Sequence, residues 1–317
     1  MSDSPLPLAP SLNTGQPSVL RRSFGVVRTM RPHQWVKNLF VVAPVVFAKQ
    51  LTDPHVIKGG LAAFAVFCLL ASAVYTLNDL VDVEADRIHP VKRRRPIASG
   101  VVPVWLAKAM VCGLFVLAIA GAVLVPPTFA AVALGYFALN VAYSFGLKKI
   151  AYLDVGCIAT GFVLRVLAGG YATRTPVSGY MVACTAALAL FLGFGKRMHE
   201  FGNANAAKQR AALQRYSPKV LLVAMSLTGF ASVAIYVAYS LDEHTRAFFR
   251  SQDGLENWLW LTSLHPLLGV LRFVLLARTR RNAESPTQEM LRDTPFMLNL
   301  VVWMLEVIVI VYRIRPT

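Results

Sequence analysis

The most regular feature of the sequence is a series of nine apolar runs, separated by short polar or charged segments. They lie at about residues 38–52, 60–80, 104–125, 127–146, 152–172, 177–195, 219–241, 255–277 and 295–313. All but the first have about the 20 residues that a helix needs to cross the hydrocarbon core of a bilayer. Because a membrane span must satisfy its own backbone polar groups, each run is expected to be a helix. The pattern predicts an all-α, polytopic membrane protein, a bundle of nine transmembrane helices.

Composition supports a membrane protein, and the placement of charge predicts its orientation. Hydrophobic residues make up 56% of the chain and charged residues 15%, with a mean hydropathy of +0.54, which is too apolar for a soluble domain. Of the 32 Lys and Arg residues, 22 fall on one side of the membrane if the N-terminus is cytoplasmic. This asymmetry predicts a cytoplasmic N-terminus in a bacterial inner membrane. It also explains the net charge of +16 without a nucleic-acid partner.

The remaining chain-wide features predict one domain behind a tail. The chain begins with a Ser- and Pro-rich stretch, and residues 1–30 are expected to form a disordered tail before a single transmembrane catalytic domain over residues 31–317. The four cysteines all fall inside apolar runs and form no C-x-x-C pair, so neither a disulfide framework nor a zinc site is predicted. A homo-oligomer stays open, because one sequence does not determine oligomeric state.

Carboxylates gather at the inner end of the second apolar run, in the segment Asn78-Asp79-Leu80-Val81-Asp82-Val83-Glu84-Ala85-Asp86. On a helix, Asp79, Asp82 and Asp86 are spaced i, i+3 and i+7, and Asn78 lies four residues before Asp82, so all four project from one face. No lysine within a turn neutralises them, and a divalent cation is the expected remedy. Mg²⁺ fits, because it takes one or two carboxylates, waters and substrate phosphate oxygens. The alternative is a solvated acidic helix end.

A basic run, Lys92-Arg93-Arg94-Arg95-Pro96, follows the acidic segment closely. Four cations beside a metal held by carboxylates would form a pocket for a diphosphate. Lys92 and Arg95 are expected to assist the departure of that group. Taken alone, the run is equally well explained as a topology signal or as a contact with lipid headgroups.

Further polar residues are expected near the same cytoplasmic face. Candidates for substrate binding are Lys37, Asn38, Asn78, Lys92, Arg95, Tyr143, Ser144, Arg165, Lys196, Arg197 and Glu200, and Lys148 and Asp154 join the three aspartates as catalytic candidates. Lys148 would reach a phosphate, and Asp154 a metal or a sugar hydroxyl. Arg165 lies inside an apolar run, where a charge needs a partner. Two partners are possible, a lipid-borne phosphate or Asp154 in a buried pair. Taken one at a time, most of the others are explained as interface anchors or helix-end ion pairs. The prediction of a site therefore depends on their convergence on one side of the membrane.

These residues resemble the UbiA superfamily of intramembrane prenyltransferases. The most specific element is the N-D-x-x-D-x-x-x-D motif, matched by Asn78, Asp79, Asp82 and Asp86. Tyr143-Ser144 followed by Lys148 is similar to a second element of that family, in the loop after the fourth helix. The resemblance runs from Arg31 to about Asp293. It implies a nine-helix bundle, an active site that opens to the cytoplasm, and Mg²⁺ held by the motif on the diphosphate of the donor.

One departure from the family pattern points to a particular branch. Family members ordinarily carry a second aspartate-rich motif after the sixth helix, where this chain reads Gly195-Lys196-Arg197-Met198-His199-Glu200. This segment is similar to the branch of decaprenyl-phosphate phosphoribosyltransferases. So are Arg31-Pro32-x-Gln34-Trp35-Val36-Lys37-Asn38, Asp86-Arg87-x-His89-Pro90-x-Lys92, Gly161-Phe162-x-Leu164-Arg165 and the region with Pro286, Glu289 and Asp293. The branch implies phosphoribosyl pyrophosphate as donor, a polyprenyl phosphate lipid as acceptor, and a role in cell-wall biosynthesis.

Together, the residues and the resemblance predict Mg²⁺-dependent transfer of 5-phosphoribosyl to a polyprenyl (decaprenyl) phosphate, with release of pyrophosphate. Mg²⁺ on the three aspartates would neutralise the leaving group. The acceptor phosphate is already an anion, so no general base is required. Lys196 and Arg197 would bind a phosphate of either substrate. One alternative is a prenyltransferase that moves a prenyl chain from a prenyl diphosphate to an aromatic acceptor. The other is an organic-phosphate transporter, which the lack of a clear internal repeat disfavours.

Overall fold

The computed structural model describes residues 18–201, 215–249, 258–279, 290 and 292–313, and every regular element in those ranges is a helix. The α-helices are α1 (Val19–Met30), α2 (Ala43–Phe47), α3 (Pro54–Val81), α4 (Val83–Ile88), α5 (Val104–Val123), α6 (Pro127–Phe145), α7 (Leu153–Thr173), α8 (Gly179–Phe201), α10 (Pro218–Leu241), α11 (Glu243–Phe249), α12 (Leu264–Thr279) and α14 (Thr294–Arg313). Four 3₁₀ helices join them: η1 (Pro32–Val41), η2 (Lys92–Arg94), η3 (Leu147–Lys149) and η5 (Trp258–Ser263). The all-α prediction is confirmed for the described residues.

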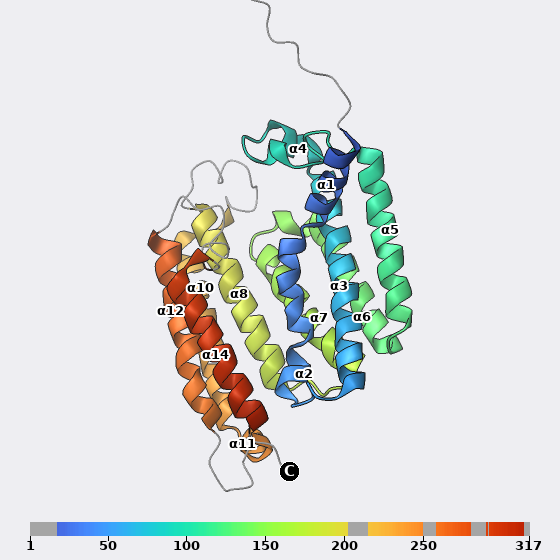
Figure 1. The fold of residues 1–317 in the computed structure, drawn as a ribbon. Coiled ribbons are helices and arrows are strands. Elements are labelled where there is room, and N and C mark those ends of the chain that lie inside the picture. Colours follow the sequence, from blue (N-terminus) through green and yellow to red (C-terminus); the bar gives the residue numbers. More distant parts are fainter. Residues whose placement is uncertain (1–17, 202–214, 250–257, 280–289, 291, 314–317) are drawn as a thin grey trace, which may run out of the picture.

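Eight of the predicted membrane spans appear as long apolar helices. They are α3, α5, α6, α7, α8, α10, η5 continued by α12, and α14, and each has the length and hydropathy to cross a bilayer. Figure 1 shows these helices side by side along one common direction. The first predicted span, residues 38–52, is different, because it is divided between the 3₁₀ helix η1 and the short helix α2. Nine regular spans and a cytoplasmic N-terminus therefore stay predictions.

The segment Pro32–Phe47 nevertheless runs through the bundle beside α3 (Figure 1), and it packs on both α3 and α7. Pro44 stands at the start of α2, where its missing N–H prevents a regular α-helix from continuing out of η1. Gly169 of α7 permits the close approach of this segment, since a Cβ at that position would lie 1.8 Å from the carbonyl oxygen of Val41. The apolar pattern located a membrane segment without revealing its irregular backbone.

The N-terminal tail is shorter than predicted. Residues 1–30 were expected to be disordered, yet Val19–Met30 form helix α1, so the prediction is wrong for that part. Ser18 caps the helix by accepting a hydrogen bond from the backbone N–H of Arg21 at 3.3 Å, as small hydroxyl residues do at helix starts. Residues 1–17 lie outside the described ranges. Helix α1 matters below because its end delivers Arg31 to the site.

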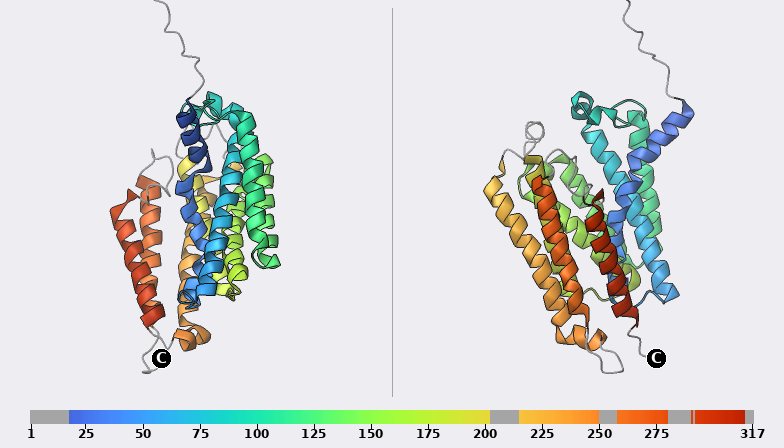
Figure 2. Two further views of the ribbon diagram at one scale, coloured as in Figure 1. Left: turned by 45° about the vertical axis from the view of Figure 1, so that its right-hand side comes forward. Right: turned by 60° about the vertical axis from the view of Figure 1, so that its left-hand side comes forward.

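Two apolar cores hold the long helices together. The first lies among η1, α3, α5, α6 and α7 and is centred on Phe67 and Phe129, whose rings meet edge to face at 6.1 Å. The second joins α8, α10 and α12 around Phe191 and Phe273, whose ring centroids are 4.8 Å apart. Helix α7 packs on α8 and so links the two parts. Figure 2 shows α12 and α14 along one side of the bundle and α5 along the other.

The up-and-down course of the chain places the polar segments at one end of the bundle. Helix α3 arrives at this end and turns into α4 and η2, and α6 arrives there before η3 and the start of α7. Helix α8 finishes at the same end, where α1 also lies (Figure 1). The acidic motif, the basic run and the segment after α6 are therefore neighbours in space, although up to about 70 residues separate them in sequence.

Candidate active site

The acidic motif lies at a break between two helices. Helix α3 ends at Val81, Asp82 is its C-cap, and α4 begins at Val83 and turns away from the axis of α3 (Figure 1). The carbonyl of Asp82 still accepts a hydrogen bond from the N–H of Asp86 at 2.8 Å. Asp79 and Asp86 are buried, whereas the side chain of Asp82 is 39% exposed. The break divides the predicted single face into two buried carboxylates and one accessible carboxylate.

Two arginines neutralise the buried carboxylates. Arg31 donates from Nη2 to Oδ1 of Asp79 at 2.6 Å. Arg95 donates from Nη1 to the same Asp79 oxygen at 3.0 Å and to Oδ2 of Asp86 at 2.6 Å. Arg31 holds a left-handed backbone with φ of 54° at the end of α1, a conformation that residues with a Cβ seldom adopt. No lysine within a turn neutralises the motif, and the tertiary fold supplies these cations from more distant positions.

The end of α6 and the 3₁₀ helix η3 complete this cluster. Lys148, on η3, donates from Nζ to Oδ1 of Asp82 at 2.6 Å. The hydroxyl of Ser144 donates to Oδ1 of Asn78 at 2.7 Å. Both bonds join positions 66 residues apart in sequence. We call Asn78, Asp79, Asp82, Asp86, Arg31, Arg95, Ser144 and Lys148 the carboxylate cluster.

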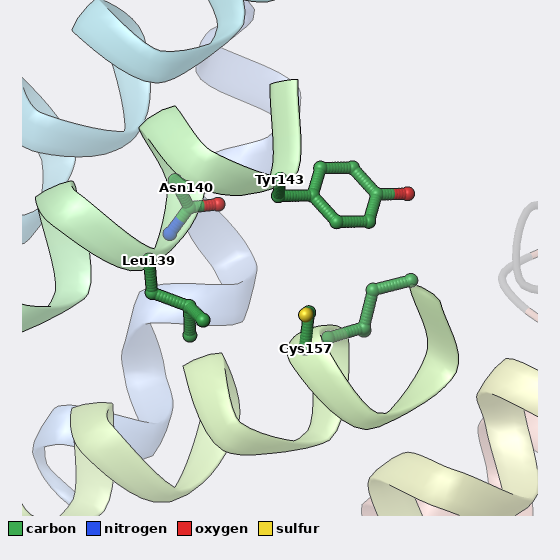
Figure 3. A pocket seen from close by; sticks show the side chains of 5 residues that line it. Leu139, Asn140, Tyr143 and Cys157 are labelled. Atoms are coloured by element: carbon green, nitrogen blue, oxygen red, sulfur yellow. The ribbon is translucent and has the colours of Figure 1, made fainter. Parts of the chain in front are cut away.

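Tyr143 stands beside the carboxylate cluster and over a small cavity. The cavity, of about 40 Å³, lies between α6 and α7 and is lined by Leu139, Asn140, Tyr143, Cys157 and Ile158. Figure 3 shows the Tyr143 side chain extending from α6 with its hydroxyl directed away from that helix. The cavity is too small for a phosphorylated sugar, so a substrate that meets Tyr143 must do so outside it.

The donor set of the carboxylate cluster fits a magnesium ion held by few protein ligands. The oxygens of Asp79 and Asp86 converge on one nitrogen, Nη1 of Arg95, so these two carboxylates already share a single cation. Asp82 and Asn78 instead bond to Lys148 and Ser144. Within the described ranges, no three Asp, Glu, His or Cys side chains are placed to hold one ion together. Mg²⁺ suits such a site, since it keeps waters and substrate oxygens as ligands.

In a second group of charged residues, the side chains bond to one another. Asp154, at the start of α7, and Arg197, on α8, are fully buried, and the Arg197 Nε lies 2.9 Å from Oδ2 of Asp154. Arg197 also donates to Glu200, and Tyr216 donates its hydroxyl proton to Asp154 while accepting from the N–H of Tyr152 at 2.8 Å. Burial and this bond raise the pKa of Tyr216, which therefore stays protonated.

This buried network, Asp154, Arg197, Glu200 and Tyr216, corrects two predicted roles. Asp154 was expected to meet a metal or a sugar hydroxyl, and Arg197 a phosphate, but each is directed to the other and neither is accessible. Glu200 pairs with Arg197. The network therefore joins α7, α8 and the segment before α10, instead of presenting charge to a ligand.

Arg165 is held by neutral groups inside the bundle. Its Nε donates to Oδ1 of Asn38 at 2.9 Å, and Nη2 donates to the hydroxyl of Tyr136 at 2.8 Å. Its guanidinium also lies over the rings of Tyr136 and Phe162, at 4.6 and 5.2 Å from their centroids. Asp154 is not the partner of Arg165, because it pairs with Arg197.

Lys37 and Arg165 form a positive region between η1 and α7. Lys37 is half-buried, and no carboxylate of the described residues contacts it. The positive charges of Lys37 and Arg165 repel each other, and a phosphate bound beside Lys37 would offset that repulsion.

The other predicted residues lie around these groups. Lys92 is exposed on η2, and Lys196 is half-buried on α8. Asp293 is buried at the start of α14 and accepts two hydrogen bonds from Arg272, at 3.0 and 2.8 Å. This pair ties α12 to α14. Pro286 and Glu289 lie outside the described residues.

Comparison with known proteins identifies the family. Residues 38–300 match the model of the UbiA prenyltransferase family. The chain belongs to the UbiA family. This member is 36% identical to the decaprenyl-phosphate phosphoribosyltransferase of Mycobacterium tuberculosis over 89% of the chain and 93% of the relative, and 32% identical to that of Corynebacterium glutamicum over 91% and 87%. A UbiA homologue of Archaeoglobus fulgidus, bound to DMAPP and Mg²⁺, has the same fold with a TM-score of 0.68 at 18% identity, covering 92% and 100% of the two chains.

Three residues of this UbiA member were missed by sequence reasoning. Arg31 was noted only as part of a motif, Tyr136 lies within an apolar run, and Tyr216 follows a charged segment. A buried arginine in a span signals that a hydroxyl or amide partner exists, which could have pointed to Tyr136. For Arg31 and Tyr216 no local pattern was available, because their partners lie 48 and 62 residues away.

Proposed function

We propose that this protein transfers 5-phosphoribosyl from phosphoribosyl pyrophosphate to a polyprenyl phosphate, such as decaprenyl phosphate, and releases pyrophosphate. The observation that carries the proposal is the similarity to relatives named decaprenyl-phosphate phosphoribosyltransferase along almost their whole length. The charged residues support it. The place of a second acidic motif is taken by the buried Arg197 network, which leaves one carboxylate cluster for the donor.

The carboxylate cluster is the proposed donor site. Three carboxylates, Asp79, Asp82 and Asp86, face three cations, Arg31, Arg95 and Lys148, so their formal charges balance before a ligand arrives. When bound there, Mg²⁺ supplies charge neutralisation for the departing pyrophosphate. Asp79 and Asp86 are the residues that would hold the ion, which frees Arg95 to bond phosphate oxygens. Arg31 and Lys148 assist, because guanidinium and ammonium groups bind phosphate strongly.

The bond changes are simple. A phosphate oxygen of the acceptor forms a bond to C1 of the ribose, and the bond between C1 and the pyrophosphate oxygen breaks with its electron pair on pyrophosphate. The acceptor oxygen is already anionic, so no side chain has to remove a proton. Arg95 and Lys148 stabilise the charge that develops on the leaving group. Lys37, beside Arg165, is the proposed contact of the acceptor phosphate, because an anion there offsets their mutual repulsion.

The finer placement in the cell is part of the proposal. The protein is proposed to lie in a bacterial inner membrane with nine spans, the segment of residues 38–52 being the first, and with the carboxylate cluster at the cytoplasmic face. The concentration of Lys and Arg on the same side as this cluster supports the orientation. Residues 31–317 form the proposed catalytic domain, and helix α1 directly precedes it. A homo-oligomer is compatible with the exposed apolar helix faces.

An assay with labelled donor tests the function. Purified protein is incubated with Mg²⁺, radiolabelled phosphoribosyl pyrophosphate and a polyprenyl phosphate, and the lipid is extracted. We expect label in the organic phase, and we expect it to vanish with EDTA. Absence of label, with turnover of a prenyl diphosphate and an aromatic acceptor, would instead assign the protein to prenyl transfer.

A further inference from the structure

The basic run after α4 is divided between two places. Arg95 faces the carboxylate cluster, where it bonds Asp79 and Asp86. Arg93 and Arg94 line a separate cavity of about 490 Å³ together with Arg21 and Arg28 of α1. Figure 1 shows α1 beside the α4 and η2 region at one end of the bundle. Four arginines from two distant segments therefore surround one hollow, which we call the arginine pocket.

Among the residues that the structure describes, no carboxylate lines the arginine pocket. All four arginines are exposed, and none makes an ion pair with a carboxylate of the described residues. The nearest acidic side chains along the chain are already engaged, since Glu84 pairs with Arg87 and Asp86 with Arg95. Four like charges around a cavity of this size repel one another, and a bound anion offsets that repulsion. Its volume suits a phosphorylated headgroup.

The outer face of α1 is apolar and lies next to the pocket. Leu20, Phe24 and Val27, spaced i, i+4 and i+7, are 81%, 74% and 51% exposed, and Phe24 also lines the pocket. Gly25 lets the opposite face of α1 pack closely on Val101, because a Cβ at this position would lie 2.8 Å from the Val101 side chain. Exposed apolar side chains beside arginines are the pattern of a helix at a membrane interface.

The level of the pocket along the bundle agrees with such an interface. Helix α5 begins at Val104, directly after the segment that carries Ser99 and Val101 of the pocket wall. Trp105 stands in its first turn and is 66% exposed. Exposed tryptophans at the ends of spans mark the boundary between hydrocarbon and headgroups.

We propose that the arginine pocket binds the headgroup of an anionic glycerophospholipid, whose acyl chains lie against Leu20, Phe24 and Val27 of α1. The phosphate is taken by Arg21 and Arg28 on one side and by Arg93 and Arg94 on the other. A free phosphate satisfies the charge but leaves the apolar face of α1 without a partner, which is why a lipid is the ligand. The site is separate from the carboxylate cluster and does not depend on the proposed reaction.

The site is also connected to the catalytic region. The same helix α1 ends at Arg31, and the same basic run ends at Arg95, and both arginines bond Asp79. A lipid held between α1 and η2 therefore fixes the two segments that position these arginines.

Direct lipid binding tests the proposal. The full chain in mild detergent is titrated with dioctanoyl phosphatidylglycerol or dioctanoyl phosphatidylcholine, and bound lipid is counted by native mass spectrometry. We expect phosphatidylglycerol to bind at least about tenfold more tightly. Arg93→Gln with Arg94→Gln, and separately Arg21→Gln with Arg28→Gln, should each weaken it by roughly tenfold to thirtyfold, given the attraction per basic residue. Equal affinity of the intact chain for the two lipids would overturn the proposal.

Matched controls separate a built pocket from general attraction. Lys149→Gln with Lys219→Gln removes two exposed charges elsewhere in the chain and should change binding less than twofold. If this control variant loses as much lipid affinity as the arginine variants, the proposal of a specific pocket is wrong. Phe24→Ser keeps every charge and should weaken the lipid severalfold without affecting competition by sn-glycerol 1-phosphate. If sn-glycerol 1-phosphate or inorganic phosphate alone binds as tightly as the lipid, and Phe24→Ser has no effect, the ligand is a soluble phosphate and the lipid proposal is wrong. Because the two arginine pairs lie on different segments, misfolding of one leaves the other as a test.

Discussion

The carboxylate cluster at the end of α3 and the buried network at the end of α8 have the same kinds of side chain but opposite character. In the cluster, Asp82 is 39% exposed and Arg31 and Arg95 are 25% and 29% exposed, so solvent reaches these three groups, whereas Asp79 and Asp86 are buried. In the network, Asp154 and Arg197 are 0% and 1% exposed and satisfy each other. In a membrane protein, a charged residue that water reaches can bind a ligand, whereas a buried charged pair holds helices together.

The buried network also bears on the proposed reaction. Arg197, Asp154 and Tyr216 lie together at the end of α8, where the charges of Arg197 and Asp154 are directed at each other. Under the proposed function, the carboxylate cluster binds the donor and the region near Lys37 binds the acceptor phosphate.

Replacing Asp79 with Asn should have the largest effect on activity. It removes the carboxylate that both Arg31 and Arg95 contact and one of the two proposed metal ligands. We expect turnover to fall by at least about a thousandfold, the scale seen when a key electrostatic contact to a transition state is lost. The measurement is phosphoribosyl transfer at saturating Mg²⁺, with the thermal unfolding midpoint as a control for folding. Retained turnover would exclude the metal role of Asp79.

Replacing Arg197 with Met should instead damage the fold. Asp154 would keep its charge in a fully buried position without its cation, a change that costs about 3–5 kcal/mol in known cases. The unfolding midpoint in detergent should fall strongly. Arg272→Met removes the partner of Asp293 at a site that is 35% exposed, and it should cost less. If Arg197→Met folds normally and only the Michaelis constant for the donor rises, Arg197 is a substrate ligand after all.

A double variant sharpens this result. Arg197→Met combined with Asp154→Asn removes both charges, so no ion is left buried, and much of the stability lost in the single variant should return. The comparison of the two single variants with the double variant measures the coupling between the residues. Strictly additive losses would mean that the two side chains do not act as a pair.

The sequence predicted the elements whose signals are local. Eight spans were recognised because long apolar runs have few alternatives, and the motif from Asn78 to Asp86 was recognised because its spacing repeats along a helix. The irregular backbone of residues 38–52 was not predicted, because Pro44 and the contact of Val41 with Gly169 decide it. Likewise, the residue type of Arg197 suits a phosphate as well as a carboxylate, and only tertiary packing selects Asp154.

Arg31 offers a test of whether exposed cations in the cluster serve the ligand. Arg31→Ala should raise the Michaelis constant for the donor by roughly tenfold to a hundredfold, as expected for a lost charged hydrogen bond, with little change in stability. Arg174 is a matched control, because it is also exposed and also has a left-handed backbone, with φ of 56°, at the end of α7. Arg174→Ala should leave the kinetics unchanged. An equal effect of both variants would point to helix capping as the cause.

Tyr216→Phe should have the smallest effect and isolates a single bond of the buried network. The tyrosine hydroxyl donates to Asp154 and accepts from the N–H of Tyr152, whose backbone φ is 66°. Removing the hydroxyl keeps the Arg197 pair and should lower stability by about 1–2 kcal/mol, with Michaelis constants unchanged. Detergent unfolding and steady-state kinetics measure the two quantities separately. A selective rise in one Michaelis constant would show that the buried network affects substrate binding. The buried network and the carboxylate cluster would then differ only in how strongly each affects the substrate.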